Sequence, residues 1–110
     1  MGKIFTITAG TALGLIISWG CAPLLPYPTR DGLLRVQASQ PNLSLQDLEI
    51  GRRLYAAHCA SCHRLHLPSE LTLKAWEKIV PRMHEKAKLD DTKGDSIMAY
   101  LTALSKDAAE

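Results

Sequence analysis

Two cysteines and a histidine stand within five residues of one another, at Cys59, Cys62 and His63 in the string Cys-Ala-Ser-Cys-His. The chain has 110 residues, three cysteines and only 5% aromatic residues. An odd number of cysteines excludes a framework made only of intramolecular disulfides. A small domain with so little aromatic bulk commonly needs a disulfide, a metal or a cofactor to stay folded. The fold of this chain is therefore expected to depend on that string.

The first twenty residues have the pattern of a targeting segment. Lys3 is the only charged residue before Arg30, and a mostly apolar run follows it from Ile4 to Trp19. A basic start and a short apolar run are typical of a secretory signal, and an uncleaved membrane anchor is the alternative. We expect residues 1–20 to be a signal segment. The rest of the chain would then be exported to the periplasm or to the outer face of a bacterial membrane.

Cys21 follows this segment in the string Ser18-Trp19-Gly20-Cys21. The string resembles a bacterial lipoprotein box, in which a small residue precedes the cysteine that is lipidated. It departs from that box at Ser18, where an aliphatic residue is usual, and at Trp19, where a small one is usual. The resemblance implies membrane attachment through lipidated Cys21. A free cysteine inside a discarded or membrane-embedded signal is the alternative.

Residues 21–43 should hold the lipid attachment site and an extended linker. Proline fixes φ and removes a hydrogen-bond donor, so a proline-containing stretch resists helix and sheet. The prolines of this stretch are Pro23, Pro26, Pro28 and Pro41. Leu33, Leu34 and Val36 are the exception, because they could pack on the domain as a short ordered piece.

The domain itself is expected over residues 44–106, followed by a short tail at 107–110. Apolar residues recur there at helical spacing, and no stretch alternates as a strand would, so the fold class should be all-α. We expect three helices, at about 45–57, at about 72–88, and from Asp90 or Asp91 to about Leu104. Their apolar stripes are Leu45, Leu48, Gly51 and Tyr55; Trp76, Val80, Met83 and Ala87; and Ile97, Leu101 and Leu104.

Local signals set the ends of these helices. Ser44 with Asp47 three residues later resembles a capping box, with Asp in place of Glu. Thr72 is a plausible N-cap of the second helix. Pro81 falls inside that helix, where it cannot donate to the carbonyl of Glu77, so a kink or a local break is expected.

The Cys59 string has the spacing of a c-type haem attachment site. Two thiols three positions apart can form thioethers with both vinyl groups of one porphyrin, and His63 then lies under the iron as an axial ligand. Three other interpretations use the same residues. The first is a thiol–disulfide centre, which usually lies in a fold with strands. The second is a zinc site that also uses His66, but its ligands would be crowded into eight residues. The third is a plain disulfide. The sequence favours one covalent haem c held by Cys59, Cys62 and His63.

Residues 51–63 resemble the N-terminal helix and haem site of class I, monohaem c-type cytochromes, and residues 97–101 resemble their C-terminal helix. In that family the two terminal helices cross at a glycine and at aromatic residues. Gly51, Tyr55 and Tyr100 match those positions. The resemblance implies a small three-helix domain folded around a covalently attached haem.

Class I cytochromes usually complete the iron with a methionine further along the chain. Met83 is the candidate here, because it shares the apolar stripe of Trp76 and Val80. Its neighbour His84 is the rival, since imidazole is also a good axial ligand. Consecutive helical residues point about 100° apart, so both cannot easily face one iron, and the stripe places His84 on a more polar face. A five-coordinate iron is the remaining alternative, and the family's methionine usually lies on a loop.

The expected function is electron transfer by one haem, with redox proteins as partners and no enzymatic activity. A net charge of +2 gives no support for nucleic-acid binding, and no small-molecule substrate is proposed. The alternatives are a haem-based binder or sensor of small ligands and a thiol–disulfide protein that uses Cys59 and Cys62. Some basic residues are expected to ring the haem edge and to steer an acidic partner. The candidates are Arg52, Arg53, Arg64, Lys86 and Lys88.

Overall fold

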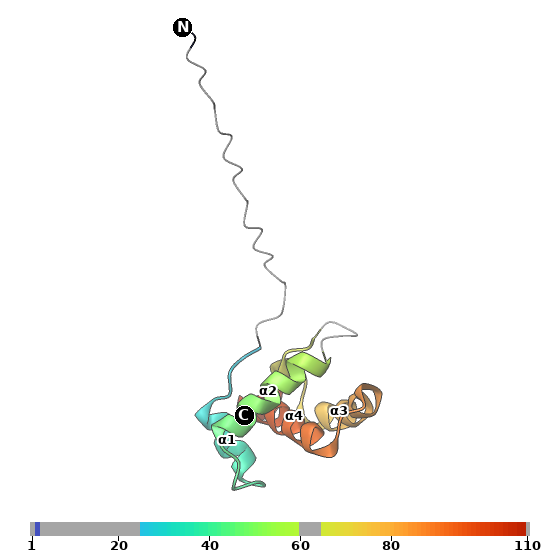
Figure 1. Cartoon of the computed structure of the whole chain (residues 1–110). Helices are drawn as coiled ribbons and strands as arrows, with labels where there is room; N and C mark the ends of the chain where they lie inside the picture. Colours follow the sequence, from blue (N-terminus) through green and yellow to red (C-terminus); the bar gives the residue numbers. More distant parts are fainter. Residues whose placement is uncertain (1, 3–24, 60–64, 110) are drawn as a thin grey trace.

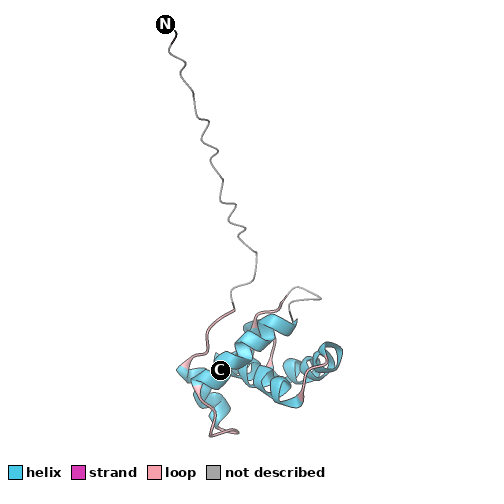
Figure 2. Ribbon diagram, viewed as in Figure 1, coloured by secondary structure: helices cyan, strands magenta, loops and turns pink. Residues whose placement is uncertain are grey.

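The computed structural model describes residue 2, residues 25–59 and residues 65–109, and regular structure in these parts is helical throughout (Figures 1 and 2). The expected all-α fold class is confirmed. Apart from residue 2, the expected signal segment lies outside the described residues, as do Cys21, Cys62, His63 and Arg64. Among the described helices, none has the length and apolarity needed to cross a bilayer. The elements are α1 (Arg30–Gln37), α2 (Leu45–Cys59), α3 (Leu73–Ala87), α4 (Asp91–Leu104) and the 3-10 turns η1 (Pro68–Glu70) and η2 (Lys106–Ala109).

Helices α2 and α4 cross in close contact, as Figure 1 shows. A Cβ atom on Gly51 of α2 would collide with the backbone carbonyl oxygen of Ser96 and would lie 2.9 Å from Cβ of Tyr100. The rings of Tyr55 and Tyr100 pack next to this point, with centroids 6.3 Å apart. The expected crossing at a glycine and two tyrosines is therefore present, and it exists because Gly51 lets the two backbones approach.

The expected helix caps are also present. The Ser44 backbone N–H donates to Oδ2 of Asp47 over 2.8 Å, and the Asp47 backbone N–H donates to Oγ of Ser44 over 3.2 Å. This reciprocal pair is the predicted capping box. The side chains of Thr72 and Asp90 accept backbone N–H groups at the starts of α3 and α4. Each satisfies a donor that would otherwise lack a partner within its helix.

The local break expected at Pro81 is absent, because α3 runs without interruption from Leu73 to Ala87. Trp76 and Val80, which precede the proline, are 1% and 8% exposed and hold that part of α3 against the core. Burial of an amphipathic face supplies most of the stability of a helix in a protein and outweighs one missing hydrogen bond.

Residues 21–43 do not form the wholly extended linker that their prolines predict. Residues 30–37 are the helix α1, whose N-cap Thr29 accepts a hydrogen bond from Gly32 N over 3.0 Å. Val36 is 1% exposed and packs in a cluster with residues of α2 and α4. The four prolines flank this stretch without entering it, so nothing in residues 29–40 prevents a helix. Leu33 and Val36 pack against the domain as expected, whereas Leu34 is 62% exposed and does not.

The arm before α1 is also built into the domain. Leu25 is 4% exposed and belongs to the same core cluster as Tyr55 and Cys59. The Tyr100 hydroxyl donates to the carbonyl oxygen of Pro26 over 2.7 Å. The arm is extended, as predicted, but it packs along the domain. Burial of the Leu25 side chain adds apolar contact to a core that has few aromatic residues.

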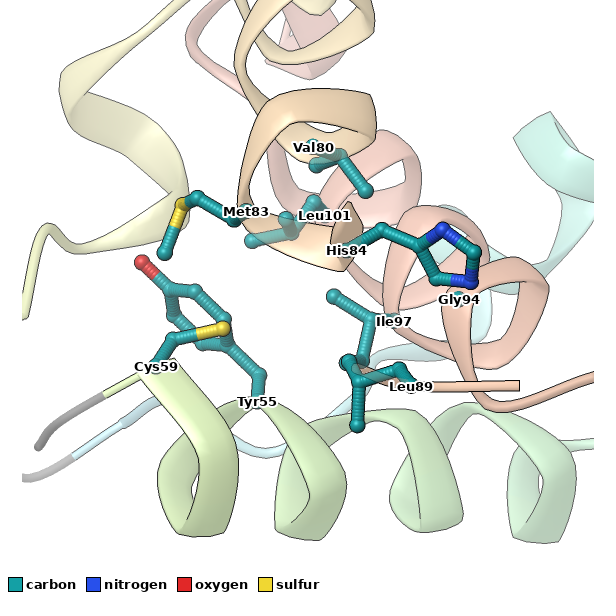
Figure 3. Close-up of a pocket in the computed structure, with 9 residues that line it drawn as sticks. All are labelled: Tyr55, Cys59, Val80, Met83, His84, Leu89, Gly94, Ile97 and Leu101. Atoms are coloured by element: carbon teal, nitrogen blue, oxygen red, sulfur yellow. The ribbon is translucent and has the colours of Figure 1, made fainter. Parts of the chain in front are cut away.

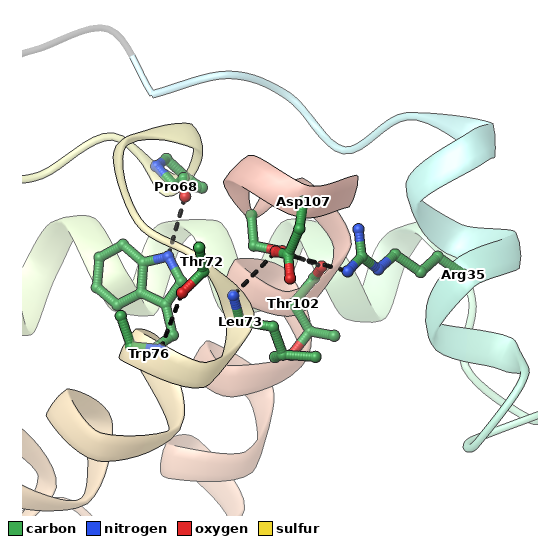
Figure 4. A network of polar contacts seen from close by, with 9 residues as sticks. Arg35, Pro68, Thr72, Leu73, Trp76, Thr102 and Asp107 are labelled. Carbon is green, nitrogen blue, oxygen red and sulfur yellow. Dashed lines mark hydrogen bonds and ion pairs between the residues drawn. The ribbon is translucent and has the colours of Figure 1, made fainter. Parts of the chain in front are cut away.

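The expected tail, residues 107–110, begins with a residue that joins three parts of the fold (Figure 4). Oδ1 of Asp107 accepts the Leu73 backbone N–H and the Ser105 hydroxyl, each over 2.9 Å, and lies 3.7 Å from Nη2 of Arg35. The hydrogen bond from Leu73 is the largest cause that lowers the pKa of Asp107. Residue 107 is therefore part of the domain, and the sequence boundary at residue 106 was too early.

Replacing Gly51 by Ala should lower the free energy of unfolding by about 2–3 kcal/mol, since the added methyl group overpacks the α2–α4 crossing. Urea unfolding followed by circular dichroism would measure the change. Gln46→Ala on the exposed side of α2 is the control and should be nearly neutral. A Gly51→Ala variant as stable as the native protein would contradict the close crossing.

Candidate haem-binding site

Helix α2 delivers the first cysteine of the motif into the interior. Cys59 is the last residue of α2 and is 8% exposed. Tyr55, one turn earlier, is 2% exposed and meets Trp76 of α3 edge to face, with centroids 5.9 Å apart and planes at 87°. The described chain resumes at Leu65, which is 7% exposed. The residues that flank the undescribed part of the motif are thus core residues.

A small cavity of about 10 Å³ lies beside Cys59, between α2, α3 and α4 (Figure 3). Its walls are apolar apart from one imidazole, and both candidate ligands of α3 contribute to it. The residues around it include Tyr55, Cys59, Val80, Met83, His84 and Ile97. The structure therefore brings the first cysteine of the motif and both candidate ligands to one apolar space.

Met83 and His84 point to opposite sides of this cavity. In Figure 3 the Met83 side chain extends to the side where Tyr55 and Cys59 lie, whereas the His84 ring points to Gly94. A Cβ atom on Gly94 would lie 2.8 Å from Cδ2 of His84, so the missing side chain makes room for the ring. His84 also lies beside Glu77 and Pro81, on the more polar flank of α3, but its side chain is only 28% exposed.

The Nε2 atom of His84 is buried and has no hydrogen-bond partner within the described part of the chain. Its nearest charged neighbour is Oδ1 of Asp91 at 3.7 Å, which is too far for a hydrogen bond. A buried nitrogen without a partner is costly and indicates that something else satisfies it. Together, the Cys59 thiol, the Met83 thioether and the His84 imidazole are donors that fit a c-type haem and its iron.

The polar atoms of the aromatic residues around the site are all used. The Tyr55 hydroxyl donates to the carbonyl oxygen of His66 over 2.6 Å, and Nε1 of Trp76 donates to that of Pro68 over 2.9 Å. Burial raises the pKa of Tyr55, so its phenol stays a protonated donor. These two bonds tie the segment after the motif to α2 and α3, and they leave only ring surface towards the interior.

The other two histidines are not part of the cavity wall. His66 is 56% exposed and its Nδ1 lies 2.8 Å from Oε2 of Glu70. His58 is only partly buried, on α2 next to Cys59. Among the described residues, no group of three or more His, Cys, Asp and Glu side chains is placed to hold a metal ion. The zinc alternative also needed Cys62 and His63, which lie outside these residues.

Burial raises the pKa of the Cys59 thiol from 9.0 to about 11. At pH 7 the thiolate fraction is then about a hundredfold lower than for an exposed cysteine, and the thiolate is the species that attacks disulfides. The environment of Cys59 is therefore unlike that of a thiol–disulfide centre, where neighbouring positive charge or a helix N-terminus lowers the pKa of the cysteine.

Two contributions to this site could not be found from the sequence. Leu25 joins the core around Cys59 although it lies 34 positions earlier in an arm with prolines on both sides. Gly94 interrupts no pattern in α4, and its role becomes visible only when His84 of another helix is placed against it. Both are long-range contacts, for which local periodicity carries no signal.

The helical fold and the Cys-x-x-Cys-His string at Cys59 agree with a c-type cytochrome. The family model described as dihaem cytochrome c matches residues 55–110, which is more than half of the chain. The chain belongs to that family. A search of the curated proteins and a search of the solved structures gave no match. The expected haem c and haem-based electron transfer follow from the family, whereas the number of haems does not, since the family is described as dihaem and the sequence holds one Cys-x-x-Cys-His string.

In the haem-free protein, Cys59 should react slowly with iodoacetamide at pH 7 and faster as the pH approaches about 11, because its pKa is raised and the thiol is protonated below that value. Mass spectrometry of the peptide that contains Cys59 would follow the reaction, with the urea-unfolded chain as control. Fast alkylation at pH 7 in the folded protein would restore the thiol–disulfide interpretation.

Proposed function

We propose that this protein is an electron carrier with one haem c, bound through Cys59 and Cys62, with His63 and Met83 as axial ligands. The observation that carries the proposal is that Cys59, the first cysteine of the single attachment motif, lines an apolar cavity together with Met83 of α3. The haem would supply an iron that changes between the ferric and ferrous states.

The side chains around the cavity would hold and shield such a group. Apolar walls such as Val80 and Ile97 exclude water. The hydrogen bonds of Tyr55 and Trp76 tie the described segment after the motif, at His66 and Pro68, to α2 and α3. Cys59 and His84 lie on different sides of the cavity (Figure 3), so these described residues do not form the nucleophile–base pair that a hydrolase or transferase would need. These features favour a carrier over an enzyme.

His84 is the competing axial ligand, because its Nε2 is buried and without a described partner. The proposal prefers Met83 on two grounds. Its side chain extends to the side of the cavity where Cys59 lies, whereas the His84 ring points away to Gly94 (Figure 3). A thioether ligand also needs no hydrogen-bond partner and suits an apolar wall.

One haem per chain is proposed because attachment consumes two cysteines and the sequence has three. Produced with cytochrome c maturation machinery, the protein should gain the mass of one haem and show the visible spectrum of a c-type cytochrome. Cys59→Ala and Cys62→Ala should each reduce or abolish stable attachment. Absence of covalent haem in the native protein would contradict the proposed function.

In the same preparation, Met83→Leu should abolish the methionine-to-ferric charge-transfer band and lower the reduction potential, since leucine keeps the volume and removes the sulfur. Met98→Leu is the matched control and should keep both properties, because Met98 does not line the cavity at Cys59. A native spectrum without that band, together with loss of six-coordination in His84→Ala, would assign the ligand to His84.

We further propose that the domain is exported and attached to a membrane through lipidated Cys21, where it meets its redox partners. The support is the apolar segment before Cys21 and the small residue Gly20 next to it. Leu25, which follows Cys21 by four residues, is buried in the domain. A span of four residues reaches at most about 14 Å, so an anchored domain would lie close to the lipid surface.

Growth of a competent bacterial host with radioactive palmitate should label the native chain, and Cys21→Ser should be unlabelled. On membrane fractionation, the native chain should be recovered with the membranes, and the Cys21→Ser chain should not. Equal labelling of both would refute lipidation at Cys21. An unlabelled native chain that stays in the membrane would indicate an uncleaved anchor instead.

A further inference from the structure

Helix α3 carries four cations at intervals of four residues along its exposed side. All four are exposed, and none forms an ion pair with another described residue. They are Lys74, Lys78, Arg82 and Lys86. Residues four apart on a helix are neighbours, so these side chains form a line of positive charge on one element.

Several cations elsewhere in the described domain are already compensated. Arg52 and Arg53 both contact Oε1 of Glu49, at 2.6 and 3.2 Å. The guanidinium of Arg52 also lies 4.2 Å from the ring centroid of Tyr27. One carboxylate offsets only one of the two guanidinium charges, so Arg52, Arg53 and Glu49 together contribute a single net positive charge. The positive charge without a described ion-pair partner is concentrated on α3, although Arg30, Lys88 and Lys106 are also exposed and make no ion pair with a described residue.

The positive charge lies on the flank of α3 next to Met83. Successive residues of a helix are about 100° apart around its axis. On this count Lys86 is the nearest of the cations to Met83 around the axis, Arg82 is the next and Lys78 is farther away. We call these three residues the cationic flank. Glu85 is the carboxylate beside it, and it makes no ion pair with a described residue, so the flank keeps a net positive charge.

The other flank of α3, next to His84, is negative. An open groove of about 490 Å³ lies there between α3 and α4. Its residues include three carboxylates, Glu77, Asp91 and Asp95, together with His84 itself. Helix α3 thus divides positive charge on the Met83 side from negative charge on the His84 side, and a charged partner will prefer one of them.

We propose that the cationic flank of α3 is the surface on which an acidic face of a redox protein docks, so that electrons pass at the Met83 side of the domain. The inference rests on the proposed function, in which Met83 is a haem ligand. A line of uncompensated cations raises the encounter rate with an acidic surface and orients it. Carboxylates on the opposite flank repel the same surface and so add to the selection of one orientation.

The test uses the holoprotein and two inorganic oxidants of opposite charge, ferricyanide and tris(phenanthroline)cobalt(III). Stopped-flow oxidation of the reduced protein is followed at several ionic strengths. The native protein should react with ferricyanide faster at low salt than at high salt. The double variant Lys78→Glu, Lys86→Glu should react with ferricyanide about tenfold more slowly than the native protein at low salt, and faster with the cobalt complex. The matched control, Arg30→Glu with Lys106→Glu, makes the same change in net charge on other exposed residues and should alter both rates less than about twofold.

Poly-L-glutamate supplies an acidic polypeptide for the same assay. It should inhibit ferricyanide oxidation of the native and control proteins and have little effect on the Lys78→Glu, Lys86→Glu variant. Equal slowing by both double substitutions, or a ferricyanide rate independent of salt, would overturn the proposal. Binding to phosphatidylglycerol vesicles that is lost only in the flank variant, without any polyglutamate effect, would assign the flank to a lipid surface instead.

These outcomes are separable from a failure of the proposed function. If the proposed function is wrong, the native protein lacks covalent haem or cannot be reduced and reoxidised. If only the docking inference is wrong, all variants keep the native visible spectrum and midpoint potential while the predicted pattern of rates is missing. The substituted lysines are exposed and make no described contacts, so their exchange should leave the fold intact.

Discussion

The close approach of α2 and α4 at Gly51 is the contact on which the rest of this domain depends. Because Gly51 has no Cβ, the α2 backbone rests on Ser96 and Tyr100 of α4. That contact fixes the line along which α2 continues, and therefore where Tyr55 and Cys59 arrive one and two turns later. The candidate haem site is set by a crossing that lies two helical turns away from the motif itself.

A domain with so little aromatic bulk closes its core by recruiting segments from outside the three expected helices. Leu25 of the arm joins the cluster around Cys59, and Val36 of α1 joins a second cluster against α2 and α4. Asp107 then ties the C-terminal turn to the start of α3 and to Arg35 of α1 (Figure 4). The arm and the C-terminal turn are thus structural parts of the domain, and a covalent porphyrin would complete its centre.

Helix α3 separates two chemically different sides of the molecule. Met83 and His84 are adjacent in sequence, yet one side chain lies on the side of Tyr55 and Cys59 and the other rests on Gly94. The exposed residues beyond them differ in the same way, with cations beyond Met83 and carboxylates beyond His84. A single helix thereby carries both candidate ligands, while the charge on its exposed surface differs between the flank next to Met83 and the flank next to His84.

The sequence by itself determined the local features: the helical class, the capping box at Ser44, the crossing residues Gly51 and Tyr100, and the motif at Cys59. Each is encoded by residues a few positions apart, or by a pattern that a known family shares. The tertiary structure alone decided the burial of Leu25, the continuity of α3 through Pro81 and the inward position of His84. These depend on partners far away in the chain, whose packing can outweigh a local preference by several kcal/mol.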